Sequence, residues 1–200
     1  MEAVIFDLGN VLLTLHWERM FAHFTRRTGK LQAELERYHA GSPWSRQFAT
    51  GEISQWDYYE AVSQELGFTG SFDEFAAAWS DMFSPNEPVL TLAHRLKGKL
   101  PRYVLSNTNA IHMRFIFDRF PCVRGFEGYI LSHEIGVEKP DRRIYDWAIR
   151  RYELEPGRTV FVDDLEENVA GARAAGLQAI HHRDAGETRR ELTKLGVPHI

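Results

Sequence analysis

The chain has 200 residues, of which 44% are hydrophobic and 26% are charged. This composition is typical of globular domains, and at roughly 150 residues per domain the length predicts one domain, or one domain that carries an insertion. The formal net charge is −4, from 24 Lys and Arg against 28 Asp and Glu. Nucleic-acid-binding proteins normally have a clustered basic excess, so we expect no nucleic-acid partner.

Cysteine usage and hydropathy indicate the compartment. Cys122 is the only cysteine, so no intrachain disulfide can form, which agrees with a reducing cytoplasm. Residues 4–13 are mostly apolar, but Glu2 precedes them and Asp7 and Asn10 interrupt them, unlike a signal peptide. No run reaches the roughly 18 apolar residues of a membrane span. We therefore expect a cytoplasmic protein with no membrane partner.

The first predicted element is a buried strand over residues 3–7, and a long helical block follows it. Residues 17 to 83 contain no convincing strand. Helical patterns cover residues 17–27, 31–39, 54–66 and 71–82, the last with a capping box at Ser71 and Glu74. Because ligands of open α/β sheets bind where the strands end, we expect this insertion to act as a lid. We assign residues 1–15 and 84–200 to the core and residues 16–83 to an all-helical cap.

The second half of the chain alternates helices with strands. Ser84 as N-cap, Pro85 at the first helical position and Glu87 as the capping-box partner predict a helix that ends near Gly98. Apolar runs predict strands at 103–106, 159–163 and 177–181, with a weaker one at 128–132, and helices at 141–151 and 166–175. This alternation predicts an α/β fold, in which a parallel sheet has helices on both faces.

Polar side chains gather at the ends of three predicted strands. Asp7 ends the first, Ser106 ends the second and is followed by Asn107, and Asp163 ends the third and is followed by Asp164. Neighbouring parallel strands would bring these groups to one spot. Each residue alone also fits a structural role, such as a turn or a helix cap.

Lys139 stands before a predicted helix, and its loop can reach the same edge. A solvated lysine before a proline is the structural alternative for this residue.

Together these residues suit a cation and a phosphate. Two carboxylates about 4 Å apart repel by about 4 kcal/mol at an effective dielectric of 20, so three of them need a cation. Oxygen ligands favour Mg²⁺. Mg²⁺ and Lys139 would attract an anion, Ser106 could hold phosphate oxygens, and a carboxylate could form an aspartyl-phosphate. The residues therefore favour phosphate ester chemistry.

The sequence resembles the haloacid dehalogenase (HAD) superfamily over nearly its whole length. The resemblance is carried, in order, by Val4-Ile5-Phe6-Asp7-Leu8-Gly9-Asn10-Val11, Leu105-Ser106-Asn107-Thr108, Lys139-Pro140 and Val162-Asp163-Asp164. It implies a Rossmann-like core with an inserted helical cap and Asp7 as nucleophile. It also implies phosphate binding by Ser106 and Lys139.

The metal ligands follow from the same resemblance. They are Asp7, the backbone carbonyl of Gly9 and Asp164, with Asp163 bound directly or through water. We expect Asp7 and Lys139 to be catalytic. We expect Ser106, Asn107 and Lys139 to bind the substrate.

Some segments resemble one branch of the superfamily, which includes a bacterial α-D-glucose-1-phosphate phosphatase and the phosphatase domain of some epoxide hydrolases. These are Asp7-Leu8-Gly9-Asn10-Val11, Gly51-Glu52-Ile53-Ser54, Leu105-Ser106-Asn107-Thr108-Asn109 and Lys139-Pro140-Asp141. Phosphatases of the superfamily usually have an acid/base aspartate two residues after the nucleophile, where this chain has Gly9. The resemblance suggests a sugar phosphate such as α-D-glucose 1-phosphate, whose anomeric oxygen leaves readily. His16 is a further candidate substrate-binding residue because it lies where the chain enters the cap.

The sequence thus predicts a Mg²⁺-dependent phosphatase for a small phosphorylated metabolite, as a monomer or weak homodimer. One alternative is a hydrolytic dehalogenase, in which the same aspartate attacks carbon without a metal. Another is a phosphate-binding or partner-binding protein that has lost catalysis, since Gly9 offers no acid/base. There is no glycine-rich nucleotide motif, so nucleotide-cofactor and kinase functions have no local support.

Overall fold

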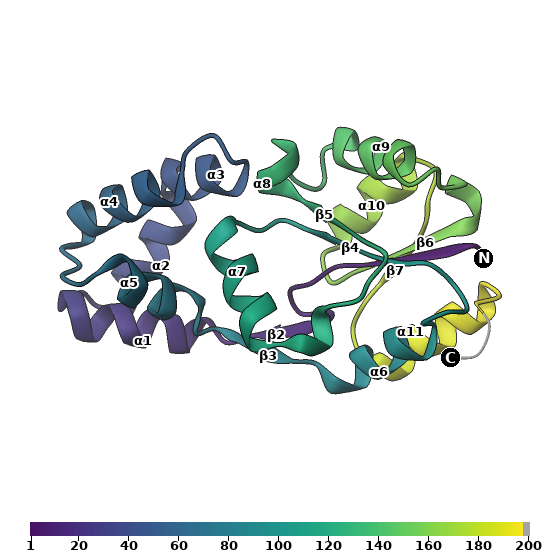
Figure 1. The fold of residues 1–200 in the computed structure, drawn as a ribbon, viewed down its shortest axis with the longest axis horizontal. Helices are drawn as coiled ribbons and strands as arrows, with labels where there is room; N and C mark the ends of the chain where they lie inside the picture. Colours follow the sequence, from purple (N-terminus) through teal and green to yellow (C-terminus); the bar gives the residue numbers. More distant parts are fainter. Residues whose placement is uncertain (198–200) are drawn as a thin grey trace.

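Five parallel strands form the centre of the fold in the computed structural model, which describes residues 1–197 (Figure 1). Their order across the sheet is β5-β4-β1-β6-β7. The bounds are Ala3–Phe6 for β1, Arg102–Ser106 for β4, Gly128–Leu131 for β5, Thr159–Asp163 for β6 and Gln178–His181 for β7. The predicted α/β class is confirmed, and all five predicted strands are present within one residue of their expected bounds.

Both faces of the sheet are buried, which explains why its strands are apolar runs. Successive side chains of a strand point to opposite faces, so Val4 and Phe6 pack in one core while Ala3 and Ile5 pack in another. Figure 1 shows α9 (Arg142–Arg151) and α10 (Glu166–Ala174) over one face. The other face is covered by α6 (Glu87–Arg95), α7 (Ala110–Arg119) and α11 (Ala185–Lys194). The short α8 (Ser132–Ile135) follows β5.

A two-stranded antiparallel ribbon links the sheet to the inserted helices. It pairs β2 (Leu13–Leu15) with β3 (Phe83–Pro85), and the prediction that no strand lies in this region was wrong at Phe83. The predicted N-cap at Ser84 was also wrong. Pro85 pairs with Leu13 at the end of the ribbon, so Asn86 takes the N-cap position and α6 begins at Glu87. Proline is acceptable there because an edge strand leaves its nitrogen without a ladder partner.

Five helices lie between β2 and β3, beyond the carboxyl end of the sheet (Figure 1). They are α1 (Trp17–Thr28), α2 (Gln32–Gly41), α3 (Pro43–Ala49), α4 (Gln55–Leu66) and α5 (Phe72–Ser80). The capping box at Ser71 is present, since its hydroxyl accepts from the Glu74 N–H. The sequence did not predict the short α3. We call α1–α5 the inserted helices.

A close contact between the inserted helices and α8 lies at Gly51, in the loop before α4. Gly51 has a φ of +71°, and a Cβ there would overlap the carbonyl oxygen of His133 in α8. Glycine is therefore needed both for its backbone conformation and for this contact.

No helix within residues 1–197 has both the length and the apolar character needed to span a bilayer.

Candidate active site

Three carboxylates meet at the carboxyl edge of the sheet. Asp7 follows β1, Asp163 ends β6, and Asp164 is the next residue. The two strands pair in parallel, with Phe6 opposite Val162, so their ends lie side by side. One carboxylate oxygen from each aspartate lies within 4.8 Å of the others. The structure therefore brings these sequence-predicted residues together.

Lys139 lies inside this cluster rather than in solvent. Its side chain is 2% exposed, and its Nζ lies 2.7 Å from Asp7 Oδ1 and 2.7 Å from Asp163 Oδ2. The same nitrogen donates to the carbonyl oxygen of Leu105 at 3.2 Å. Its three N–H groups thus have three acceptors, so direct contact with a phosphate requires one of these bonds to be exchanged. The alternative of a solvated lysine is excluded.

The charges of Asp7 and Lys139 depend on each other. Burial raises the pKa of Asp7 to about 7, and the repulsion of Asp163 adds to this, while Lys139 opposes it. Burial alone would lower the pKa of Lys139, but the two carboxylates beside it raise that pKa instead. Lys139 is therefore charged at neutral pH, and its positive charge favours the ionised, nucleophilic form of Asp7.

Ser106 ends β4, the strand on the other side of β1, and Asn107 follows it, but their side chains differ in role. Ser106 is 4% exposed, and within residues 1–197 its hydroxyl has only a long contact of 3.5 Å with the Asn107 carbonyl oxygen. It is thus available to a ligand.

The side-chain amide of Asn107 already makes two hydrogen bonds to the backbone of Lys139. It donates to the carbonyl oxygen of Lys139 at 3.0 Å and accepts from the Lys139 N–H at 2.8 Å. Asn107 therefore holds the backbone of Lys139, and the structure does not present its side chain as a free substrate ligand.

Two residues of the site were not singled out by the sequence. Asn10, with a φ of +52°, donates to Asp164 Oδ2 at 3.0 Å and accepts from the Leu15 N–H. Asn168 on α10 donates to Asp163 Oδ1 at 2.9 Å, where the Leu165 N–H also donates. The role of Asn10 could have been predicted from the sequence, since asparagine readily adopts the left-handed conformation that this loop needs. Nothing in the sequence indicated a site role for Asn168, because an asparagine in the first turn of a helix is common.

A cavity of about 300 Å³ opens over these groups. Asp7, Gly9, Ser106, Lys139 and Asp164 line it, and so do Asn10, Leu15, Trp17, Asn107, Leu165 and Asn168. Gly9 has a Leu15 methyl group 3.2 Å from where a Cβ would stand. Within the described chain, His16 is not among the lining residues. Its Nε2 lies 2.8 Å from the Ser84 hydroxyl of the ribbon, so the structure places it outside the cluster.

Carboxylates, a buried lysine and a hydroxyl at the carboxyl edge of a parallel sheet are typical of an α/β protein that binds a cation and an anion there. Residues 1–176 match the model of the haloacid dehalogenase-like hydrolases, and the chain belongs to this family. The expected family and its Rossmann-like fold are thereby confirmed.

Several characterised proteins are similar over almost their full length. Sesquiterpene phosphatase astK of Aspergillus oryzae is 29% identical over 198 residues, which cover 97% of this chain and 96% of that protein. D-ribitol-5-phosphate phosphatase of Bacteroides thetaiotaomicron is 24% identical over 199 residues, which cover 95% of this chain and 96% of that protein. The HAD family enzyme bt-2542 of the same species, crystallised with magnesium and inorganic phosphate, has a TM-score of 0.82 and 26% identity. That match covers 92% of this chain and 94% of the enzyme.

Proposed function

We propose that this protein is a Mg²⁺-dependent phosphatase that hydrolyses a small phosphorylated metabolite through an aspartyl-phosphate at Asp7. The observation that supports this most directly is the placement of Lys139 between Asp7 and Asp163, with Asp164 beside them. The names of the relatives, which are phosphatases, support the same reaction class.

The donor set fits Mg²⁺. Carboxylate oxygens of Asp7 and Asp164 and the carbonyl oxygen of Gly9 are hard ligands, and three carboxylates against one lysine leave room for further positive charge. The magnesium complex of bt-2542 supports the same metal. Mg²⁺ bound by these residues would neutralise the phosphate and the carboxylates around it. Asp163 already has Lys139, Asn168 and the Leu165 N–H as partners, so we assign it to positioning or to a contact through water.

The reaction then follows from the residues of the site. An oxygen of Asp7 attacks phosphorus, and the ester oxygen leaves with the bonding electrons and takes a proton from water. Without neutralisation, a carboxylate approaching a phosphate dianion faces about 8 kcal/mol of repulsion at an effective dielectric of 20, so Lys139 has to stay charged. The Ser106 hydroxyl donates to a phosphate oxygen. Water then hydrolyses the aspartyl-phosphate, which regenerates Asp7 and releases phosphate.

In the first step, Gly9 offers no side-chain acid that could protonate the leaving oxygen. A general acid typically contributes about 10²–10⁴-fold to such a step. Substrates with good leaving groups lose least, and we therefore propose a sugar phosphate such as α-D-glucose 1-phosphate as the first compound to test. The inserted helices α1–α5 would act as the cap that the sequence predicts over residues 16–83, and would enclose the leaving group.

The test is hydrolysis of phenyl phosphate with Mg²⁺ by the wild type and by Asp7→Asn. We expect the variant to lose at least about 10³-fold, because it removes the nucleophile. Asp118→Asn, at an exposed carboxylate of α7, serves as the control and should keep full activity. Equal rates for the wild type and Asp7→Asn would contradict the proposal and favour a binding protein. Dehalogenation of a 2-haloacid that survives a chelator would favour the dehalogenase alternative.

The monomeric or weakly dimeric state and the cytoplasmic location remain predictions from the sequence. Sedimentation of the purified protein and the redox state of the single Cys122 in cells would test them.

A further inference from the structure

A second cavity, of about 390 Å³, adjoins the first and reaches into the inserted helices. It shares Gly9, Leu15, Trp17, Ser106 and Asn107 with the cavity over Asp7. A phosphate held at Asp7 and Ser106 would therefore direct the rest of its ester into this second space. We call it the leaving-group cavity.

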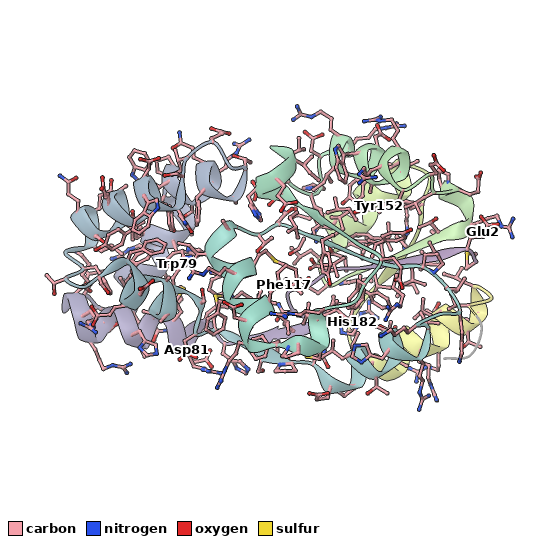
Figure 2. The ribbon with its side chains drawn as sticks, viewed as in Figure 1. Glu2, Trp79, Asp81, Phe117, Tyr152 and His182 are labelled. Carbon is pink, nitrogen blue, oxygen red and sulfur yellow. The ribbon has the colours of Figure 1, made fainter. Side chains whose placement is uncertain are left out.

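Aromatic rings form much of the wall of the leaving-group cavity. Phe48 stacks on Tyr58 with ring centroids 4.4 Å apart, and Tyr58 meets Trp79 edge-to-face at 5.3 Å. Trp79 stacks on His112 of α7 at 6.2 Å, and His39 meets Trp79 at 5.5 Å. Figure 2 shows Trp79 among the side chains of the inserted helices. Rings packed in this way form a rigid, largely apolar wall.

Polar atoms in this wall lack hydrogen-bond partners. Within residues 1–197, the hydroxyl of Tyr58, the Nε1 of Trp79 and the Nδ1 of His39 make no hydrogen bond although all three atoms are buried. Tyr58 is 0% exposed and Trp79 is 4% exposed. The Ser45 hydroxyl lines the same cavity and is likewise buried without a hydrogen bond within residues 1–197. Buried polar groups in native proteins are normally paired, and leaving one unpaired is destabilising.

We infer that Tyr58 and Trp79 bind an oxygen atom at the end of the leaving group that is farthest from the phosphate, with His39 beside them. The indole N–H of Trp79 can only donate, so the ligand atom has to accept, as a hydroxyl, ether or carbonyl oxygen does. This inference rests on the proposed phosphatase function. It defines the substrate as a phosphate monoester whose leaving group packs on aromatic rings and carries an oxygen at its distal end.

Matched pairs of substrates test this directly. Each n-alkyl phosphate from four to eight carbons is compared with the ω-hydroxyalkyl phosphate of the same length, by kcat/KM with Mg²⁺. We expect kcat/KM to be higher for the hydroxylated member by about tenfold or more at one chain length. The plain alkyl phosphate of that length has no oxygen to accept from the buried donors and leaves them unpaired. The preference should vanish at lengths that cannot reach Tyr58. A ratio of one at every length would overturn the inference.

Tyr58→Phe removes one hydroxyl and should bring the ratio for the preferred length close to one. The control is Tyr38→Phe, which removes another buried hydroxyl, in α2, that does not line the leaving-group cavity. It should keep the wild-type ratio. Trp79→Phe provides a second variant at the same subsite and should also lower the ratio. A ratio unchanged by both Tyr58→Phe and Trp79→Phe would overturn the inference.

Phenyl phosphate separates this result from the proposed function. If its hydrolysis requires Asp7 while the alkyl pairs show no preference, only the inference fails. If no phosphate monoester is hydrolysed in a manner that requires Asp7, the proposed function fails and the inference falls with it.

Discussion

Lys139 controls the charge balance of the site at the scale of single residues. Its ammonium group is the cation that lies between Asp7 and Asp163. Lys139→Met would leave two buried carboxylates facing each other, and breaking a buried ion pair in this way typically costs about 3–5 kcal/mol. We therefore expect the variant to lose that much unfolding free energy in a chelator, as measured by urea denaturation. Mg²⁺ should restore part of it, because it returns positive charge.

Lys97→Met is the control for this change, since Lys97 is exposed. It should alter the unfolding free energy by less than about 0.5 kcal/mol. A Lys139→Met protein that is as stable as the wild type without metal would show that the charges of the cluster are not coupled as described.

Gly9 offers a second residue-scale prediction. Gly9→Asp alone should gain little, because the new Cβ would stand 3.2 Å from a Leu15 methyl group. Gly9→Asp with Leu15→Ala should raise kcat/KM for an alkyl phosphate by about tenfold, since a carboxyl there can protonate the leaving oxygen. Phenyl phosphate should gain less, because phenoxide leaves without help. The matched control is Gly9→Asn with Leu15→Ala, and an equal gain from it would rule out acid catalysis.

At the scale of elements, His112 joins α7 to the inserted helices. Its Nδ1 lies 3.2 Å from the Asn109 Nδ2 and its Nε2 lies 3.3 Å from the carbonyl oxygen of Trp79. The Asn109 Oδ1 accepts from the His112 N–H, so its amide nitrogen donates to the ring, and the imidazole is neutral with the proton on Nε2. Burial lowers the pKa of His112 to about 3.

This has a consequence for stability against pH. The pKa of His112 is lower in the folded chain than in the unfolded one, so its contribution is complete above about pH 6.5 and is lost as the pH falls towards 3. We expect about 3 kcal/mol of unfolding free energy to be lost through this group between pH 7 and pH 4. Urea denaturation of wild type and His112→Gln at several pH values measures the difference. His94→Gln, at an exposed histidine, should follow the wild type.

Gly51 and Gly67 form a natural comparison at the same scale. Both have left-handed backbones, with φ of +71° and +72°, but a Cβ at Gly67 meets no atom within 4 Å, whereas one at Gly51 overlaps the His133 carbonyl oxygen. Gly67→Ala should cost about 1 kcal/mol of unfolding free energy from backbone strain alone. Gly51→Ala should cost more and should also raise KM, because it displaces the inserted helices from α8. Equal effects of the two variants would contradict a close contact at Gly51.

The sequence predicted the sheet well, because strands buried on both faces are apolar throughout and their carboxyl ends are marked by polar residues. It failed where pairing decides the structure. The ribbon of Leu13–Leu15 and Phe83–Pro85 has three residues in each strand, too few to show a period, and Ser84 and Pro85 also suit a helix start. Only the distant partner reveals that Pro85 belongs to a strand.

The candidate site divides in the same way. The convergence of Asp7, Asp163 and Asp164 followed from parallel strands, since adjacent strand ends must meet. The use of the Asn107 amide by Lys139, 32 residues away, depends on loop geometry that no local pattern encodes. The orientation of His16 towards Ser84 likewise depends on how the chain turns after the ribbon.

For the whole molecule, metal binding and folding should be linked. A cation held by the folded chain alone stabilises it by RT ln(1 + [Mg²⁺]/Kd), about 2.7 kcal/mol at a concentration 100 times Kd. We expect Mg²⁺ to raise the unfolding free energy of the wild type by this law, and Asp164→Asn to lose most of the increase. In a chelator, Asp164→Asn should be at least as stable as the wild type, because it removes one of three mutually repelling carboxylates. Asp118→Asn should behave as the wild type in both conditions, and equal stabilisation of Asp164→Asn by Mg²⁺ would place the cation elsewhere.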